Sequence, residues 1–242
     1  MVYLVLADVH GNLPALEAVL AAAARFDEVW CLGDLVGYGA EPDECVELLR
    51  QYRHVAVAGN HDWAALGRLD LDDFNPIARI SAVWTGKRLT PATRAYLEAL
   101  PLQLVVGPYT IVHGSVRHPL WEYIDSAAAA WDNMQGQSTP FCLVGHTHVP
   151  AVYTEQSEKR TREFLVQGSS VSFALGQGRA VLNPGSVGQP RDGDWRAAFA
   201  LLDTEKATWT VHRVEYPVEQ AQERILRAGL PAQNAFRLAF GR

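Results

Sequence analysis

Five short polar segments, each following a run of apolar residues, constrain the fold of this chain more than any other feature. The first apolar run, residues 2–7, has the continuous apolar character of a strand that is covered on both faces. It leads into Asp8 and His10, although a buried strand has no structural need for a carboxylate and an imidazole at its tip. The other four segments are Gly33-Asp34, Gly59-Asn60-His61-Asp62, Val112-His113-Gly114-Ser115 and Gly145-His146-Thr147-His148.

The N-terminal part of the chain predicts alternating strands and helices. Strands are expected at residues 2–7, 28–32 and 54–58, with helices between them at about 14–24 and 42–52. Each of these helices has a proline at a favoured first-turn position. A repeated strand, helix, strand order is typical of parallel βαβ units.

The remainder of the chain has a different character. Helical patterns dominate residues 63–100, and further helices are expected at 126–135 and 218–228. Closely spaced strands indicate antiparallel hairpins. We therefore expect an α/β fold, a two-sheet β-sandwich flanked by helices in αββα layers, built as a single domain over residues 1–242. The strands expected in this part lie near residues 102–106, 110–112, 141–144, 151–154, 163–166, 180–182, 198–202 and 208–214.

Charge and cysteine content narrow the class of protein. The net charge is -6 and no long Lys/Arg run offsets it, which argues against an extended nucleic-acid surface. The three cysteines, Cys31, Cys45 and Cys142, are odd in number and widely spaced, so free thiols in a reduced compartment are expected. No basic leader and no apolar run of about 18 residues is present. We expect a soluble cytoplasmic protein.

The five polar segments are expected to meet at one edge of the fold, because ligands of open α/β sheets bind beyond the carboxyl ends of the strands. Their side chains supply oxygen and nitrogen donors without thiolate, a combination that suits Mn²⁺, Fe²⁺, Co²⁺, Ni²⁺ or Zn²⁺. Eight such groups are too many for one tetrahedral ion and match two ions that share a carboxylate. The groups are Asp8, His10, Asp34, Asn60, His61, His113, His146 and His148.

The order of these segments resembles that of the calcineurin-like metallophosphoesterases. The blocks are Asp-x-His, Gly-Asp-x4-Gly, Gly-Asn-His-Asp, His and Gly-His-x-His, and they span residues 8–148. The Gly-Tyr-Gly within the second block and the stretch Asn183-Pro-Gly-Ser-Val-Gly-Gln-Pro-Arg191 resemble the small bacterial and archaeal phosphodiesterase-like members. Five ordered blocks make the resemblance specific, whereas a single block would be weak evidence.

The resemblance implies two divalent metal ions, with Mn²⁺ the best candidate and Fe, Ni²⁺, Co²⁺ or Zn²⁺ as alternatives. Asp34 would bridge the two ions. The implied first site is Asp8, His10, Asp34 and His148, and the implied second site is Asp34, Asn60, His113 and His146.

The resemblance also implies a reaction, the attack of a metal-bridging hydroxide on phosphorus. His61 would face the substrate, stabilise developing charge and give a proton to the leaving group. Protein phosphatases of this superfamily carry an aspartate three positions beyond the bridging one, where this chain has Gly37. Either Asp62 or a backbone carbonyl would therefore orient His61, or this imidazole would be held less firmly.

Other residues have less specific signals. Asn12 would bind substrate phosphate or stabilise its turn, and Arg191 would contact phosphate or pair with Asp192 or Asp194. Ser186 is expected to be structural. Aromatic residues could stack on a nucleobase, although tryptophans more often fill cores. The aromatic candidates are Trp63, Trp84, Trp121, Tyr123 and Trp131.

The predicted function is a dinuclear phosphoesterase acting on phosphodiesters or on small nucleotide or phosphomonoester substrates. Helical segments at about 63–100 and 115–138 would shape the substrate cleft. The expected partner is a small phosphoester, with no membrane and no extended nucleic acid, and a homo-oligomer is compatible with the sequence. Two alternatives remain open: a non-catalytic metal-binding scaffold with the same fold, and a nuclease of the same superfamily.

Overall fold

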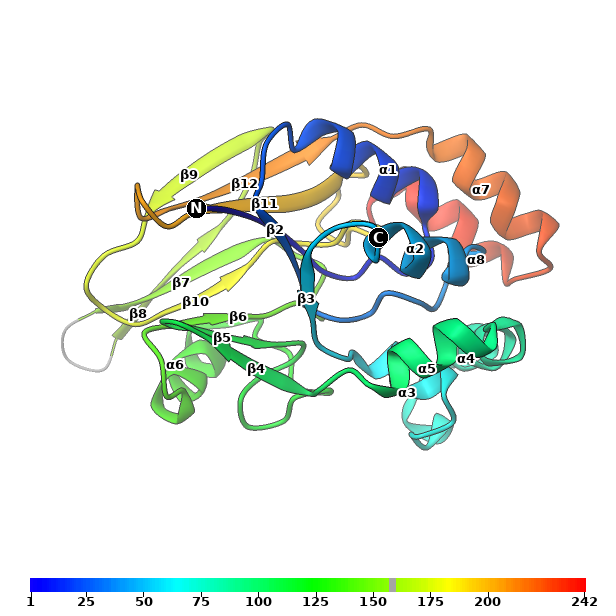
Figure 1. Ribbon diagram of the computed structural model, residues 1–242, viewed down its shortest axis with the longest axis horizontal. Coiled ribbons are helices and arrows are strands. Elements are labelled where there is room, and N and C mark those ends of the chain that lie inside the picture. The colour runs from blue at the N-terminus through cyan, green and yellow to red at the C-terminus, as the bar shows by residue number, and fades with distance from the viewer. Residues whose placement is uncertain (157–159) are drawn as a thin grey trace.

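A computed structural model describes residues 1–156 and 160–242 as two six-stranded sheets that pack face to face (Figure 1). The predicted two-sheet α/β sandwich flanked by helices is confirmed. In spatial order, the first sheet contains β3 (His54–Ala56), β2 (Glu28–Cys31), β1 (Val2–Leu6), β11 (Ala197–Asp203), β12 (Thr208–Val214) and β9 (Ser170–Ala174). The second contains β4 (Gln103–Val106), β5 (Tyr109–Val112), β6 (Phe141–Leu143), β10 (Ala180–Asn183), β7 (Ala151–Gln156) and β8 (Arg160–Leu165).

The N-terminal βαβ units form as predicted. Strands β1, β2 and β3 are parallel, with α1 (Leu13–Ala22) and α2 (Pro42–Leu49) as the crossover helices. Strand β11 joins the other side of β1 as an antiparallel neighbour. In the second sheet β5, β6 and β10 run parallel, so their carboxyl ends point the same way.

The continuous apolar character of β1 follows from burial on both faces. Leu4 and Leu6 pack in the core between the first sheet and its helices, which include α1, α2 and α7 (Val218–Arg227). Val5 and Ala7 point the other way, into the core between the two sheets. That inner core also contains the fully buried Trp30.

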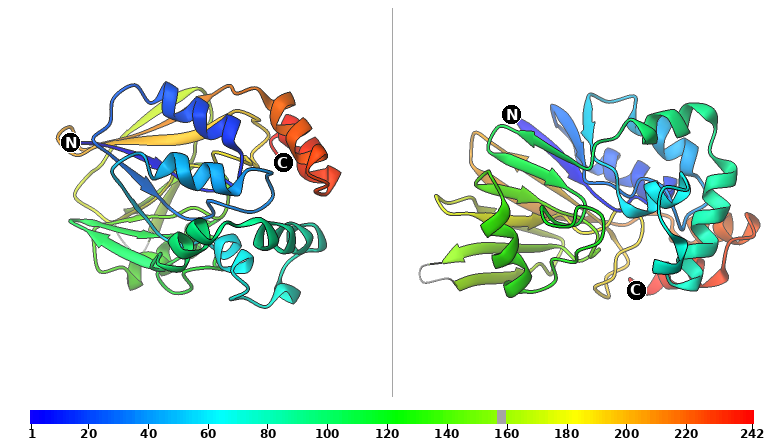
Figure 2. Two further views of the ribbon diagram at one scale, coloured as in Figure 1. Left: turned by 45° about the vertical axis from the view of Figure 1, so that its right-hand side comes forward. Right: turned by 90° about the horizontal axis from the view of Figure 1, so that it is seen from below.

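Helices occupy the ends and outer faces of the sandwich. Figures 1 and 2 show α3 (Asn60–Ala65), α4 (Pro76–Arg88) and α5 (Pro91–Glu98) at one end, with β8 at the other. These helices and the short 3-10 helix Leu71–Asp73 confirm the helical prediction for residues 63–100. Helix α6 (Ala127–Gly136) contacts β7, β8 and β10, and Ser126 caps its N-terminus. Within the described ranges, the helices are too short or too polar to span a bilayer.

Three elements differ from the sequence-based expectations. Strand β9 was not predicted, because its serines have low strand propensity and its pairing with β12 joins distant parts of the chain. The C-terminal helix α8 (Ala232–Phe236) and the 3-10 turn Arg237–Phe240 are too short for a helical period to be visible. Within the expected helical segment 115–138, residues 115–126 form a loop.

Candidate metal centre

The five polar segments meet at one end of the sandwich, beyond the carboxyl ends of parallel strands from both sheets. Asp8, Asp34 and Asn60 follow β1, β2 and β3 of the first sheet, whereas His113 and His146 follow β5 and β6 of the second. All seven predicted ligands are buried: Asp8, His10, Asp34, Asn60, His113, His146 and His148. The structure therefore brings together every residue that the sequence proposed as a ligand.

Four of these residues form a first group. Asp8, His10, Asp34 and His148 each offer one ligand atom, and these atoms lie within 4.8 Å of one another. Within the group, His10 Nε2 lies 3.6 Å from Asp34 Oδ2, and His148 Nε2 lies 3.5 Å from Asp8 Oδ1. This is the set expected for the first metal.

A second group shares Asp34 with the first. It consists of Asp34, His113 and His146, again with ligand atoms within 4.8 Å of one another. His113 Nε2 lies 3.4 Å from Asp34 Oδ2 and 3.1 Å from His146 Nδ1. The Asn60 side-chain oxygen lies 3.2 Å from the same His113 Nε2, so the fourth expected ligand is also at this position.

Backbone carbonyls fix the orientation of three of the imidazoles. The Nδ1 atoms of His10, His113 and His148 lie 3.2, 2.9 and 2.5 Å from carbonyl oxygens of Val36, Leu32 and Gln189, respectively. Because Nδ1–H donates to these carbonyls, each Nε2 presents its lone pair towards the centre of the site. Carbonyl partners of this kind are typical of metal-binding histidines.

The residues present fit a divalent cation. Two buried atoms, Asp8 Oδ2 and Asp34 Oδ2, have no hydrogen-bond partner among the described residues. Buried polar atoms are rarely left unpaired. Metal coordination would satisfy both at once.

The electrostatics of the site favour the same interpretation. Burial raises the pKa of Asp8 to about 7, because little solvent reaches the carboxyl group. The nearby carboxylate of Asp34 shifts this pKa in the same direction. Burial also lowers the pKa of His146 to about 3, so this imidazole is neutral, as a ligand must be. Bound cations would neutralise the buried carboxylates and make their ionised form favourable.

Backbone strain is concentrated at the same residues. Eight non-glycine residues of the described chain have a positive φ, and five of them are predicted ligands. Such residues cost of order 1–3 kcal/mol and cluster at functional sites. The five are Asp8 (54°), His10 (51°), Asp34 (54°), His146 (65°) and His148 (61°). Sharp left-handed turns at the strand ends thus aim these side chains into the site.

His61 lies beside the ligand groups and is held by packing. Its ring contacts His10, Tyr38 and Phe74, with ring centroids 4.9, 4.4 and 5.3 Å away. Burial lowers the pKa of His61 to about 4, so the imidazole is neutral near pH 7. His61 Nδ1 has no hydrogen-bond partner among the described residues.

Neither of the contacts expected to orient His61 is seen. The Asp62 carboxylate instead accepts hydrogen bonds from the backbone N–H groups of Asp34, Val36 and Gly59, at 2.9, 3.1 and 2.9 Å. Asp62 therefore fixes the loops that carry Asp34 and Asn60. The His61 ring is positioned by its neighbours, among them Gly37.

Asn12 and Arg191 have different surroundings. The Asn12 side-chain oxygen accepts a hydrogen bond from Ala15 N and so caps α1. Its side-chain nitrogen donates to the Gly188 carbonyl at 2.9 Å, so both polar atoms of the amide already have partners within the protein. Arg191 lies over the Tyr38 ring at 5.9 Å and donates to the Gln189 side chain.

The carboxylates considered as partners of Arg191 are engaged elsewhere. Asp192 pairs with Arg213, and Asp194 pairs with Arg196. The Arg191 Nε atom is buried and has no partner among the described residues. This leaves Arg191 available to an anion beside the metal ligands.

Two residues near the site were missed by the sequence analysis. Gln189 supplies the carbonyl beside His148, and its place in the Asn183–Arg191 stretch that resembles the family was the available signal. Ser186, expected to be structural, donates from Oγ to the Asp8 carbonyl at 2.8 Å. Tyr38 packs on His10 and His61 but had no signal beyond its glycine neighbours.

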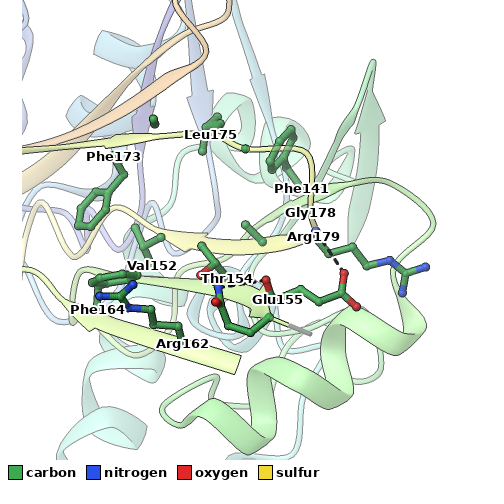
Figure 3. A pocket seen from close by; sticks show the side chains of 14 residues that line it. Phe141, Val152, Thr154, Glu155, Arg162, Phe164, Phe173, Leu175, Gly178 and Arg179 are labelled. Carbon is green, nitrogen blue, oxygen red and sulfur yellow. Dashed lines mark hydrogen bonds between the residues drawn. The ribbon is translucent and has the colours of Figure 1, made fainter. Parts of the chain in front are cut away.

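A separate cavity lies at the opposite ends of the same strands (Figure 3). It has a volume of about 300 Å³, and its lining includes Phe141 and Ala180, the first residues of β6 and β10. Phe164, Phe173 and Val152 make its wall largely apolar. None of the predicted site residues lines it.

Comparisons with known proteins agree with this geometry. A protein of Methanocaldococcus jannaschii, described only as uncharacterized, is 36% identical over 245 residues, which covers 98% of this chain and 97% of that protein. The crystal structure of a metallophosphoesterase from Sphaerobacter thermophilus is 46% identical, with a TM-score of 0.91 over 100% of this chain and 99% of that chain.

A more distant similarity covers about half the chain. A symmetrical bis(5′-nucleosyl)-tetraphosphatase from Glaesserella parasuis is 28% identical over 135 residues, 52% of this chain and 48% of that protein. The calcineurin-like phosphoesterase superfamily domain itself matches residues 1–207. Together with the buried Asp/His groups, this match shows that the chain belongs to the calcineurin-like phosphoesterase superfamily.

Proposed function

We propose that the protein is a dinuclear metal-dependent hydrolase of phosphodiesters or of small nucleotide or phosphomonoester substrates. The position of Asp34 Oδ2, 3.6 Å from His10 Nε2 and 3.4 Å from His113 Nε2, carries this proposal. One carboxylate oxygen borders both ligand groups, as a bridging ligand must.

Two cations bound there would neutralise phosphate oxygens and lower the pKa of a coordinated water to about 7. Mn²⁺ is the proposed ion, and Fe, Ni²⁺, Co²⁺ or Zn²⁺ would suit the same donors. One ion would be held by Asp8, His10, Asp34 and His148, and the other by Asp34, Asn60, His113 and His146.

His61 would face the phosphate and give a proton to the leaving oxygen. With its pKa at about 4 the free imidazole is neutral. A phosphate anion beside it would stabilise the protonated form and raise this pKa. Asp62 would support the reaction indirectly, by fixing the backbone at Asp34.

Arg191 would bind a phosphate oxygen, because its guanidinium lies beside the site with an unpartnered Nε. Asn12 was also proposed to contact phosphate. Its amide is used by Ala15 N and the Gly188 carbonyl, which favours the alternative of a turn-stabilising residue.

Small substrates are favoured over polymers. The net charge of -6 does not favour a strand-binding groove, which argues against the nuclease alternative. The similarity to a bis(5′-nucleosyl)-tetraphosphatase supports nucleotides as the substrate class. Oligomeric state, and the expected cytoplasmic location, remain predictions.

The test is hydrolysis of bis(p-nitrophenyl) phosphate with Mn²⁺ by the wild type and by the Asn60→Ala and His61→Ala variants. We expect turnover by the wild type and a loss of at least 10²-fold in Asn60→Ala. His61→Ala should lose less activity on this ester, because p-nitrophenolate leaves without a proton and only the stabilisation of developing charge is removed. His212→Ala, which alters a histidine on β12, is the matched control and should keep full activity. Full turnover by either site variant would show that these roles are wrongly assigned.

The same preparation separates the alternatives. A protein that binds two ions but hydrolyses no phosphoester with Mn²⁺, Ni²⁺, Co²⁺, Mg²⁺ or Zn²⁺ would be a scaffold. Cleavage of single- or double-stranded DNA in a gel assay would identify a nuclease.

A further inference from the structure

Two aromatic side chains contact imidazoles of the site, and a third packs on one of these two. Tyr123 stacks on His146 with ring centroids 4.0 Å apart and planes inclined by 15°. Phe74 meets His61 edge-on at 5.3 Å and contacts Trp121 at 4.9 Å. We call Phe74, Trp121 and Tyr123 the aromatic wall.

The aromatic wall is not part of the packed interior. Trp30 and Trp209 belong to the core between the sheets, and Trp84 and Trp195 pack against the core under the helices. The three hydrophobic cores of the described residues include no member of the aromatic wall. Core filling therefore does not explain why these rings are here.

Tyr123 has a surface open to a ligand. Its side chain is 46% exposed although one ring face is covered by His146. The uncovered part of this ring offers a flat apolar surface on which a planar group can stack. A planar group stacked on this ring would lie next to a ligand of the second metal group.

The loop that carries Trp121 and Tyr123 is held rigidly. Within residues 115–126, the Glu122 carboxylate accepts a hydrogen bond from Ser115 Oγ and pairs with Arg117, which also pairs with Asp132 of α6. The Tyr153 hydroxyl donates to the Ile124 carbonyl at 3.3 Å. A platform fixed before binding loses little entropy when a ligand arrives.

We propose that the aromatic wall binds the base of a nucleoside phosphoester whose phosphate lies at the metal ligands. This inference rests on the proposed function and specifies its substrate class. Every nucleobase has a π-face, so stacking would accept several bases with little sequence preference. The two chain segments expected to shape the cleft, 63–100 and 115–138, contact each other through Phe74 and Trp121.

The test uses two esters that differ only in the base. One is the p-nitrophenyl ester of thymidine 5′-phosphate, and the other is its abasic analogue, with hydrogen in place of thymine. Both release p-nitrophenol, so the ratio of their kcat/KM values reports the contribution of the base. We expect thymine to raise kcat/KM about tenfold in the wild-type enzyme, the size of one base–aromatic stack.

Four variants separate stacking from a structural effect. Tyr123→Leu and Trp121→Leu should reduce the ratio to about twofold or less, and the ratio cancels any change in kcat/KM that is common to both esters. Tyr123→Phe retains the ring and should keep the ratio. Phe173→Leu, which alters the remote cavity of Figure 3, should behave as the wild type.

The outcomes distinguish the two proposals. Equal kcat/KM values for the two esters in the wild type, or an unchanged ratio in both leucine variants, would overturn the aromatic-wall assignment and leave the phosphoesterase proposal standing. If neither ester is hydrolysed with Mn²⁺, the proposed function fails and the assignment fails with it.

Discussion

Gly37 and His61 are packed so closely that the backbone of one shapes the position of the other. A Cβ atom on Gly37 would lie 2.8 Å from His61 Nδ1 and 3.0 Å from His61 Cβ. Gly37 also has φ +99°, a backbone conformation that residues with a side chain rarely adopt. Protein phosphatases of the superfamily carry an aspartate at this position. In this chain the backbone of Gly37 instead packs against the imidazole of His61.

Gly37→Ala should consequently displace the His61 ring. We expect kcat to fall on the order of 10²-fold, since a shift of about 1 Å at a catalytic group has an effect of this size. The matched control is Gly229→Ala, because Gly229 has φ +73° but open space around its Cβ position. Gly229→Ala should lower the free energy of unfolding by about 1 kcal/mol and keep kcat. Equal kcat values for the two variants would show that the contact has no role.

The number of metal ions bound per chain should depend on whether a substituted residue belongs to one ligand group or, like Asp34, to both. Wild-type protein dialysed against Mn²⁺ should hold two ions per chain, His113→Ala one ion, and Asp34→Ala fewer than one, because only Asp34 belongs to both groups. Metal analysis by mass spectrometry measures this directly. Two ions retained by Asp34→Ala would contradict the bridging role.

Removing the metal should also destabilise the fold. Free Mn²⁺ at 100 times its Kd stabilises a protein by about 2.7 kcal/mol if it binds the folded state alone. A chelator should therefore lower the Tm of the wild type, and added Mn²⁺ should restore it. The Tm of Asp34→Ala should respond to neither.

The role of His61 predicts a dependence on the leaving group. p-Nitrophenolate leaves without a proton, whereas an alkoxide needs one, so His61→Ala should reduce kcat much more for an alkyl ester. The loss expected from removing a general acid is about 10²–10⁴-fold. Comparing kcat for the two ester types in wild type and variant measures the difference. An equal loss for both esters would exclude proton donation by His61.

Ser186 links two turns beneath the first ligand group. Its Oγ donates to the Asp8 carbonyl and accepts from Gln189 N, both at 2.8 Å, in a fully buried position. Ser186→Ala leaves the Gln189 N–H unpaired and should lower the free energy of unfolding by about 1–3 kcal/mol. Urea denaturation measures this. Ser172→Ala on the exposed side of β9 is the control and should change stability by less than about 0.5 kcal/mol.

The three cysteines are free and buried. Burial raises the pKa of the Cys142 thiol to about 12, so almost no thiolate exists at pH 8 and its fraction grows only as the pH approaches that value. A disulfide reagent at pH 8 should therefore titrate less than one thiol in the native protein and three after unfolding in guanidinium. Rapid reaction of the folded protein would contradict this burial.

The sequence located the buried polar residues of the candidate metal centre better than it located the outer elements. Asp34 and His113 were identifiable because each follows an apolar strand and lies beside a glycine, a local signal that needs no knowledge of distant contacts. Strand β9 had no such signal, because its pairing with β12 depends on a partner far along the chain. The same limit applies to α8, whose Asn234 donates to the carbonyl of Tyr38 across the fold.

The sequence by itself determined the fold class, the candidate ligands and the family resemblance, because apolar periodicity and residue type are local properties of the chain. Only the tertiary structure decided which groups hold His61, what Asp62 binds, and that Phe74 and Trp121 meet beside the site. These relationships depend on the packing of segments distant in the sequence, where a few tenths of an ångström decide whether a contact forms. No spacing along the chain encodes such distances.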